Sequence, residues 1–337
     1  MANTKEIQRR IKSVRSTAKI TRAMEMVSAA KMRRATEAVL KTRSYANLSW
    51  TTVLNLTNDV DYTKLHPLLA RRPEIKRVAI ILFAANRGLC GSFSSALINK
   101  VQASIDRHQT NEQGQPLVHE FLVAGKKGLA VGSRWGHKIA AEFAKSETAP
   151  AIGDISAIAK LVIKEFLDGN YDKVLVAYTD FDSVSLQTPR VKQLLPIDIN
   201  AADDHLGVVG KNKNVGLDKE FLKAKEAKYL SAADYQFTPL NPEGSGLRAG
   251  NLTGFTYEPN PMAILDRMIP RLIEVQLLQA LLESNASEQS ARMTAMHQAN
   301  EAADELVGEL TLDYNKMRQA GITAEIAEIA AGAAALN

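Results

Sequence analysis

Two long stretches without helix-breaking residues constrain this chain of 337 residues more than any other feature. The first proline is Pro67 and the first glycine is Gly88, so residues 1–66 contain neither. Residues 271–320 contain no proline, and their single glycine is Gly308. Since proline and glycine are the residues that most often interrupt helices, each end is predicted to form one very long helix. At ~1.5 Å per residue such helices reach roughly 75–85 Å, well beyond the diameter of a small domain.

Apolar residues in both stretches recur at the spacing of a coiled coil. Alternating steps of three and four residues run from Leu265 to Met317 in the C-terminal stretch. A similar stripe begins near the N-terminus and then drifts. Many of these positions are Ala, Ser or Met, which allow close approach but bury little area, so a coiled coil of modest strength is predicted. The residues expected to form its contacts include Ile7, Ile11, Val14, Met24, Met293 and Met296.

The two ends carry opposite charge. Residues 1–43 hold twelve Lys or Arg against three Glu, a net charge of +9, and residues 262–337 hold five against eleven acidic residues, a net charge of −6. Such asymmetry is typical of a nucleic-acid-binding arm or of two segments that pair with each other. The aromatic residues expected for base stacking are missing from the basic helix, whose first aromatic residue is Tyr45. Pairing of the two helices is therefore the preferred interpretation.

Between the helices, apolar runs rich in β-branched residues alternate with amphipathic stretches, which is typical of a small α/β domain with a largely parallel sheet. Strands are expected at residues 77–84, 120–124 and 173–178, with 190–197 as a possible addition. Helices are expected at residues 93–107, 135–144 and 155–168. The predicted units are an N-terminal coiled-coil helix (1–66), an α/β domain (75–197), a surface insertion (198–250) and a C-terminal coiled-coil helix (260–337).

No motif in the α/β domain predicts an active site. Arg87–Gly91 (RGLCG) and Gly125–Gly128 each follow a strand, where phosphate-binding loops lie, but neither fits the GxGxxG or GxxxxGK[ST] pattern. The single cysteine, Cys90, excludes an intramolecular disulfide and is read as a small buried thiol, typical of a reducing cytosol. The six histidines are scattered, without metal-ligand spacing. No catalytic residue, cofactor or metal is predicted.

Targeting and membrane segments are not expected either. The N-terminus has no apolar core of a secretory signal, and no window approaches the ~18 uninterrupted apolar residues of a membrane span. The last nine residues, 329–337, carry no charged side chain. They are read either as a frayed alanine-rich helix end or as an apolar tip enclosed by another protein.

Several sequence blocks resemble a known family, the γ subunit of the F-type ATP synthase. The C-terminal block 322–336 (ITAEIAEIAAGAAAL) is similar to the signature at the end of that family. Blocks 283–296 (ESNASEQSARMTAM) and 310–320 (LTLDYNKMRQA) match it closely, as do IQRRIKSV and ITRAMEMVSAAKM in the N-terminal helix. The loop at 85–94 departs from the usual family form, with Asn86, Ser92 and Ser94 in place of Asp, Gly and Asn.

This resemblance implies an antiparallel coiled coil with a Rossmann-like α/β domain at its base. It implies a non-catalytic rotor that couples proton-driven rotation to ATP synthesis or hydrolysis on other subunits. The implied partners are three α and three β subunits, the ε subunit and the membrane c-ring, at the cytoplasmic face of a bacterial membrane, without nucleic acid and without a lipid span. It also implies contact with the surrounding ring at Arg318, Gln319, Ile322, Thr323 and Glu325.

Two alternatives from other functional classes stay open at this point. A nucleic-acid adaptor would explain the basic N-terminal helix but not the acidic C-terminal one. A Rossmann-type enzyme would explain the central domain but lacks a phosphate fingerprint and a catalytic group.

Overall fold

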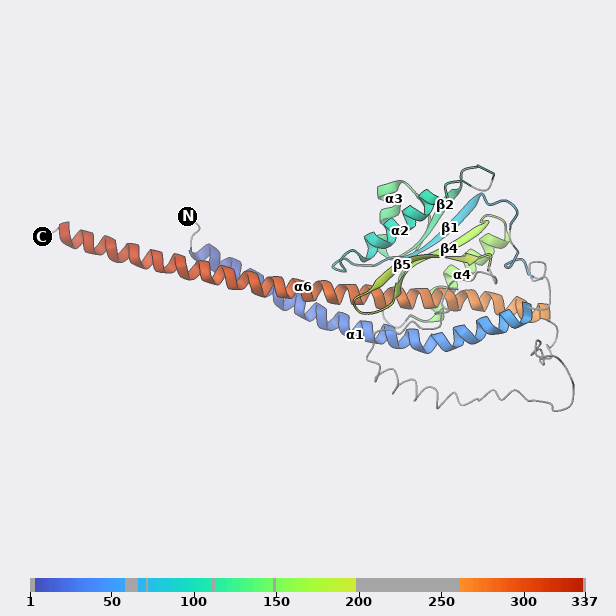
Figure 1. The fold of residues 1–337 in the computed structure, drawn as a ribbon, viewed down its shortest axis with the longest axis horizontal. Helices are drawn as coiled ribbons and strands as arrows, with labels where there is room; N and C mark the ends of the chain where they lie inside the picture. The colour runs from blue at the N-terminus through green and yellow to red at the C-terminus, as the bar shows by residue number, and fades with distance from the viewer. Residues whose placement is uncertain are drawn as a thin grey trace, which may run out of the picture.

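The computed structural model describes residues 4–57, 66–70, 72–110, 113–147, 150–197 and 261–335. Two long helices dominate it: α1 (Thr4–Thr57, 54 residues) and α6 (Pro261–Ala335, 75 residues). They lie side by side and form what we call the shaft, with an α/β domain packed beside one end (Figure 1). At ~1.5 Å per residue, α6 is about 110 Å long. The predicted insertion at 198–250 and residues 58–65 of the predicted N-terminal helix lie outside the described residues. Residue 66, the last of that predicted helix, is described and is not helical.

Polar contacts set the register of the shaft and show that its helices are antiparallel, as predicted. Thr21 hydrogen-bonds to Asn300. Thr42 Oγ1 donates to Gln279 Oε1 at 2.7 Å. In both pairs the residue numbers add to 321, so each residue of α1 faces a definite position of α6. Polar pairs inside an apolar seam specify register at some cost in stability.

The seam predicted from the heptads is visible as a stripe of lower exposure on α6. Beyond the α/β domain, Ala303, Val307, Leu310, Tyr314 and Met317 are half-buried while most of their neighbours are exposed. On the register above, Thr4 at the start of α1 lies opposite Met317. Residues 318–331 are all exposed, so the last turns of α6 continue as a single helix (Figure 1).

The α/β domain is built on a five-stranded sheet in the order β3-β2-β1-β4-β5. The strands are β1 (Arg77–Phe83), β2 (Val118–Ala124), β3 (Lys138–Phe143), β4 (Lys173–Phe181) and β5 (Gln187–Leu195). The first four are parallel, and β5 pairs with β4 in the antiparallel direction. The largely parallel sheet expected from the sequence is therefore confirmed.

Each face of the sheet is covered by helices. Helix α2 (Phe93–Arg107) and the short α3 (Ala130–Trp135) pack on one face, over Val78, Ile80 and Leu82. Helix α4 (Ile152–Leu167) and the first third of α6 pack on the other, over Ala79, Ile81 and Phe83. In α6 this buried part includes Leu265, Ile269, Leu272, Ile273, Leu277 and Leu281. Helix α6 therefore belongs both to the shaft and to the core of the α/β domain.

The helix predicted at 135–144 is wrong. Helix α3 ends at Trp135, Gly136 takes a left-handed conformation (φ 70°), and Lys138–Phe143 is the edge strand β3. A left-handed glycine commonly terminates a helix. The alanines in KIAAEF favour a helix in isolation, but exposure alternates residue by residue along the segment and its backbone pairs with β2. Tertiary pairing thus overrides local helix propensity.

None of the helices among the described residues is both long and apolar enough to span a bilayer.

Candidate functional site

In a doubly wound sheet, ligands bind beyond the carboxyl ends of the strands, where the strand order changes direction. Here that point lies between β1 and β4, and α6 passes across it. Ser284 Oγ donates to the carbonyl of Phe83, the last residue of β1, at 3.1 Å. Ser287 Oγ donates to the carbonyl of Thr179, near the end of β4, at 3.1 Å. The place where a nucleotide would lie in such a sheet is therefore filled by the chain's own helix.

The part of α6 that crosses the sheet edge, which we call the docking segment, runs from residue 283 to 292. Its serines and Ala286 are fully buried, and their small size lets the helix approach the strand ends closely. Asn285 Nδ2 donates to the carbonyl of Ser146 at 2.9 Å, and Ser290 Oγ donates to that of Val184 at 2.8 Å. The small polar residues that interrupt the heptad seam therefore attach the shaft to the α/β domain by hydrogen bonds.

A buried ion cluster lies at the end of the docking segment. Glu288 Oε2 is 2.7 Å from Lys145 Nζ, and its Oε1 is 2.8 Å from Arg292 Nη2. The side chains of Lys145, Glu288 and Arg292 are 0%, 1% and 8% exposed. The Arg292 guanidinium also donates to the carbonyls of Arg87 and Gly88 at 3.4 Å. Buried charges persist only when paired and hydrogen-bonded, as Glu288 is from both sides.

The loop at residues 145–147, which follows β3, contacts both helices of the shaft. Lys145 and the carbonyl of Ser146 bind α6, as described above, while Glu147 Oε2 is 3.0 Å from Lys31 Nζ of α1. Asn86 Nδ2 donates to Glu147 Oε1 at 3.2 Å and to the carbonyl of Lys145 at 2.9 Å. Burial acts to raise the pKa of Glu147, but the hydrogen bonds from Lys31 and Asn86 outweigh it and lower the pKa below its usual value.

The two glycine turns that resembled phosphate loops have structural roles. In the first, the carbonyls of Arg87 and Gly88 point at Arg292, whereas a phosphate-binding loop presents N–H groups. Cys90 is 3% exposed, and its burial raises the pKa of the thiol. In the second turn, a Cβ at Gly125 would collide with the carbonyl of Ala84. This glycine therefore allows the turn to pack against the end of β1.

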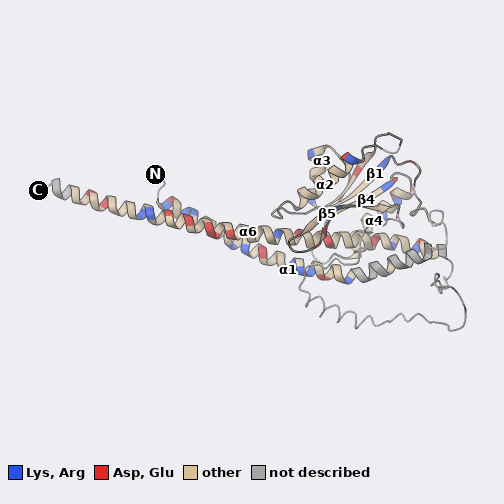
Figure 2. Ribbon diagram, in the orientation of Figure 1, with Lys and Arg blue, Asp and Glu red and all other residues tan. Residues whose placement is uncertain are grey.

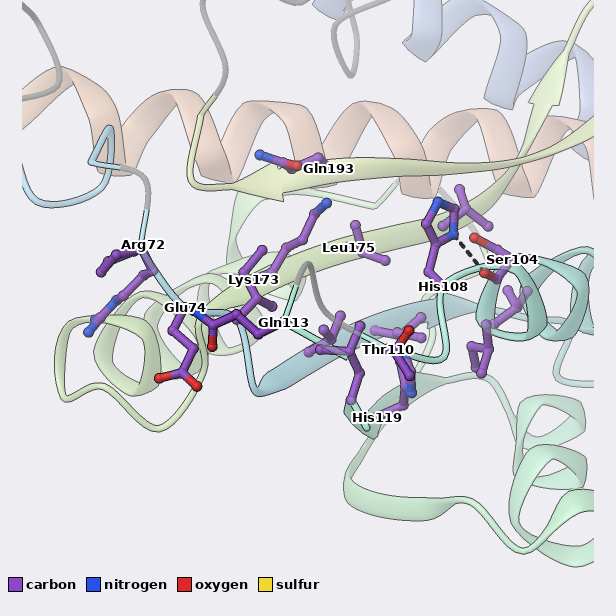
Figure 3. Close-up of a pocket in the computed structure, with 18 residues that line it drawn as sticks. Arg72, Glu74, Ser104, His108, Thr110, Gln113, His119, Lys173, Leu175 and Gln193 are labelled. Atoms are coloured by element: carbon purple, nitrogen blue, oxygen red, sulfur yellow. Dashed lines mark hydrogen bonds between the residues drawn. The ribbon is translucent and has the colours of Figure 1, made fainter. Parts of the chain in front are cut away.

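A cavity of about 440 Å³ opens on the α2 face, near the amino ends of β1 and β4 (Figure 3). Val78, Ile80 and Leu175 contribute to its apolar lining, and His108 and His119 lie at its polar side. Burial lowers the pKa of His119, helped by nearby His137 and His108, so the imidazole is neutral at pH 7. His108 Nδ1 is 2.9 Å from the carbonyl of Ser104 and so carries the proton. The lining is mixed, because charged residues such as Arg72, Glu74 and Lys173 face the same cavity as the apolar side chains.

The residues expected to contact a partner ring all lie on the single-helix end of α6. Arg318, Gln319, Ile322, Thr323 and Glu325 are exposed. Ile322, Ile326 and Ile329, at steps of four and three residues, are 48%, 62% and 74% exposed. They form an apolar stripe along a part of α6 that no other helix covers within the described ranges. An unpartnered stripe of this kind is typical of a surface that another protein covers.

The residues expected in the coiled coil lie along the shaft. Ile7 and Met296 are buried, and Ile11, Val14, Met24 and Met293 are half-buried. Charged pairs add to the contact: Arg22 lies 3.4 Å from Asp304, and His297 lies 3.0 Å from Glu25. Figure 2 shows acidic residues of α6 gathered where that helix crosses α1. At exposed positions such pairs contribute little stability, typically below ~1 kcal/mol.

The chain was compared with known protein families and sequences. A family model described as ATP synthase matches residues 3–336. The ATP synthase gamma chain of Roseiflexus castenholzii is 40% identical over 336 residues, which is 100% of this chain and 99% of that protein. The ATP synthase gamma chain of Herpetosiphon aurantiacus is 38% identical over 343 residues, covering both proteins fully.

Solved structures share the fold at lower sequence identity. A chain from the cryo-EM structure of the Euglena gracilis mitochondrial ATP synthase matches with a TM-score of 0.59 and 16% identity, covering 99% of this chain and 94% of that one. A chain from the central stalk and c-ring structure of the Tetrahymena thermophila mitochondrial ATP synthase matches with a TM-score of 0.53 and 20% identity, covering 83% and 99%.

Proposed function

The chain belongs to the family of ATP synthase γ chains, and on that premise we propose that it is the rotating central shaft of a proton-driven ATP synthase. In this role it couples rotation of the membrane ring to ATP synthesis or hydrolysis on other subunits. The observation that carries the proposal is the shape of the shaft. Two helices leave the α/β domain together, and one of them continues alone as an exposed helix with an apolar stripe (Figure 1).

The position of α6 supports a non-catalytic role. Ser284 and Ser287 hold this helix against the carboxyl ends of β1 and β4, where a Rossmann-type enzyme would bind its nucleotide. On this proposal the nucleotide sites lie on the partners, which are three α and three β subunits arranged as a ring. The α/β domain stands at the other end of the shaft, on the ε subunit and the c-ring, at the cytoplasmic face of the membrane.

The exposed end of α6 is the part that turns inside the ring. Its isoleucine stripe, Ile322, Ile326 and Ile329, suits an apolar sleeve. Arg318 and Gln319, one turn earlier, suit a polar contact with a β subunit, because a guanidinium binds a carboxylate by charge-assisted and often bidentate hydrogen bonds. Thr323 and Glu325 extend the same contact surface.

The mechanism requires contacts that differ with the angle of the shaft. A single asymmetric helix touches each β subunit differently and so shifts each nucleotide site towards its open or closed form. Since coupling between sites is reciprocal, nucleotide binding at a β subunit in turn changes the preferred angle of the shaft. The two-helix part supplies stiffness, because paired helices resist bending more than one helix does.

Assembly with partner subunits tests this function. The chain is co-expressed with the α and β subunits of the same source, and the purified complex is assayed for ATP hydrolysis and for rotation of a bead fixed to the α/β domain. We expect co-purification and ATP-dependent rotation in one direction. A chain truncated after Met317 loses the single-helix end of α6; its helical content should fall only by the helical residues removed, 318–335, but it should bind the ring more weakly. A parent chain that is purified without α and β, or with salt-sensitive nucleic acid instead, would contradict the proposal.

A further inference from the structure

We propose that the loop at residues 145–147, together with Glu288, fixes the rotational position of the shaft on the α/β domain, so that torque passes between them without slip. This inference rests on the proposed rotary function and adds positioning residues to it. These residues act through the shaft, by holding it at one angle relative to the domain that the membrane ring would turn.

The position of the cluster favours this role. Arg292, which binds the carbonyls of Arg87 and Gly88, lies where α6 leaves the α/β domain. About two turns further on, Asn300 hydrogen-bonds to Thr21 and Glu25 of α1, and the two helices continue away from the sheet together (Figure 1). The docking segment therefore lies at the junction through which torque would pass between the shaft and the domain.

The docking segment adds directional contacts to the apolar packing of α6 on the sheet. Ser284, Ser287 and Ser290 donate hydrogen bonds to main-chain carbonyls of the α/β domain, and Ala286 is fully buried beside them. The earlier part of α6 opposes rotation as well, because its large apolar side chains are close-packed in the core of the domain. Charge-assisted hydrogen bonds depend on angle and distance and are stronger than the neutral ones of the serines, so the Lys145–Glu288–Arg292 cluster contributes most to fixing the rotational position.

One loop holds both helices at this level. Lys145 and Ser146 bind Glu288 and Asn285 of α6. Glu147, the next residue, binds Lys31 of α1 at 3.0 Å. Because consecutive residues of a single short loop hold the two helices, the shaft is attached as a unit. The side chain of Asn86 fixes the loop in turn, through Glu147 and the carbonyl of Lys145.

The test uses the complete synthase in membrane vesicles, with Glu288→Gln as the variant. Glutamine keeps the size of the side chain but removes the charge that Lys145 and Arg292 share. Glu274→Gln is the matched control, because Glu274 lies on the same helix and pairs with Arg271 at the same 2.8 Å, within α6 alone. The measurement is the ratio of ATP-driven proton pumping to ATP hydrolysis. We expect this ratio to fall roughly two-fold or more in Glu288→Gln and to stay at the parent value in the control.

A second variant keeps the test valid if the uncompensated cations prevent folding. In Lys145→Met/Glu288→Leu/Arg292→Met the whole cluster becomes apolar at similar volume, a replacement that is often neutral or stabilising. This variant should melt near the parent temperature and assemble, yet show the reduced ratio. It should also widen the angular fluctuation of a bead fixed to the α/β domain when the shaft is held by the ring.

The outcomes separate this inference from the proposed function. If a stable, assembled variant keeps the parent's pumping ratio and bead fluctuation, the cluster contributes only stability and the inference is overturned. If the parent chain itself does not assemble with α and β subunits, the rotary function fails, and this inference fails with it.

Discussion

Cysteines introduced at Val14 and Val307 should form a disulfide within one chain. The register seen at Thr21–Asn300 and Thr42–Gln279 places these two half-buried valines opposite each other across the shaft. The bond would close a loop of about 290 residues, for which the loop-entropy model gives about 5–6 kcal/mol of stabilisation, an upper value because geometric strain reduces it. The variants are made in a Cys90→Ser background, since Cys90 is the only other cysteine.

The assay compares oxidised and reduced protein on denaturing gels and in thermal melts followed by circular dichroism. Oxidation should give a monomer of altered mobility, and its melting temperature should rise by at least several degrees over the reduced form. Val14→Cys with Leu312→Cys is the control, because Leu312 is 64% exposed and lies off the seam. Crosslinks formed only between chains, or formed equally well by the control pair, would refute the antiparallel register.

Three further predictions concern the tip, the sheet edge and acid pH. Changing Arg318 and Gln319 to Ala should leave the helical content of the isolated chain intact, because both are exposed and Ala favours helices. It should lower ATP synthesis of the assembled complex severalfold; parent rates at both low and high salt would place the contact elsewhere. Calorimetry should detect no ATP or NAD binding at micromolar concentration, because α6 fills the nucleotide position; a measurable heat of binding would contradict this. The lowered pKa of Glu147 means that its contribution to stability is present above the usual pKa of 4.5 and is lost as pH falls through the lower folded value. Melts between pH 7 and pH 3 should show this loss, and Glu147→Gln should reduce it; an equally steep decline in the variant would assign it to other groups.

The long helices and the sheet could be predicted from sequence because their signals are local. Long stretches without proline keep the backbone donors of a helix, and α6 has Pro270 only near its start. The buried strands β1 and β4 are largely apolar runs. The edge strand β3 was missed because KIAAEF has only one sheet neighbour and little apolar character. Its strand conformation comes from pairing with β2, a contact between distant residues that composition does not encode.

The role of the docking segment could not be predicted from the sequence, for a different reason. Its small polar residues are plain in the sequence, but they read as weak positions of a coiled-coil seam. Their hydrogen-bond partners are mostly main-chain carbonyls, such as those of Phe83 and Thr179. Because every residue has such a carbonyl, the sequence does not identify which one is the partner. The informative feature was Glu288, a carboxylate among small residues on an otherwise buried part of a helix. Such a residue calls for a buried cation, although sequence alone does not say that it is Lys145.

The pairing of α1 with α6 also governs how the chain is made. The first helix emerges from the ribosome long before its partner, since about 280 residues separate the end of α1 from the end of α6. At ~5–20 residues per second, synthesis leaves α1 without α6 for roughly 15–55 s. During this time Ile7, Met32 and Val39, buried in the finished shaft, lack their α6 partner, and the sheet face that α6 covers is open as well. The nascent chain therefore offers chaperones an extended apolar stripe, and its folding ends only when the last helix is released.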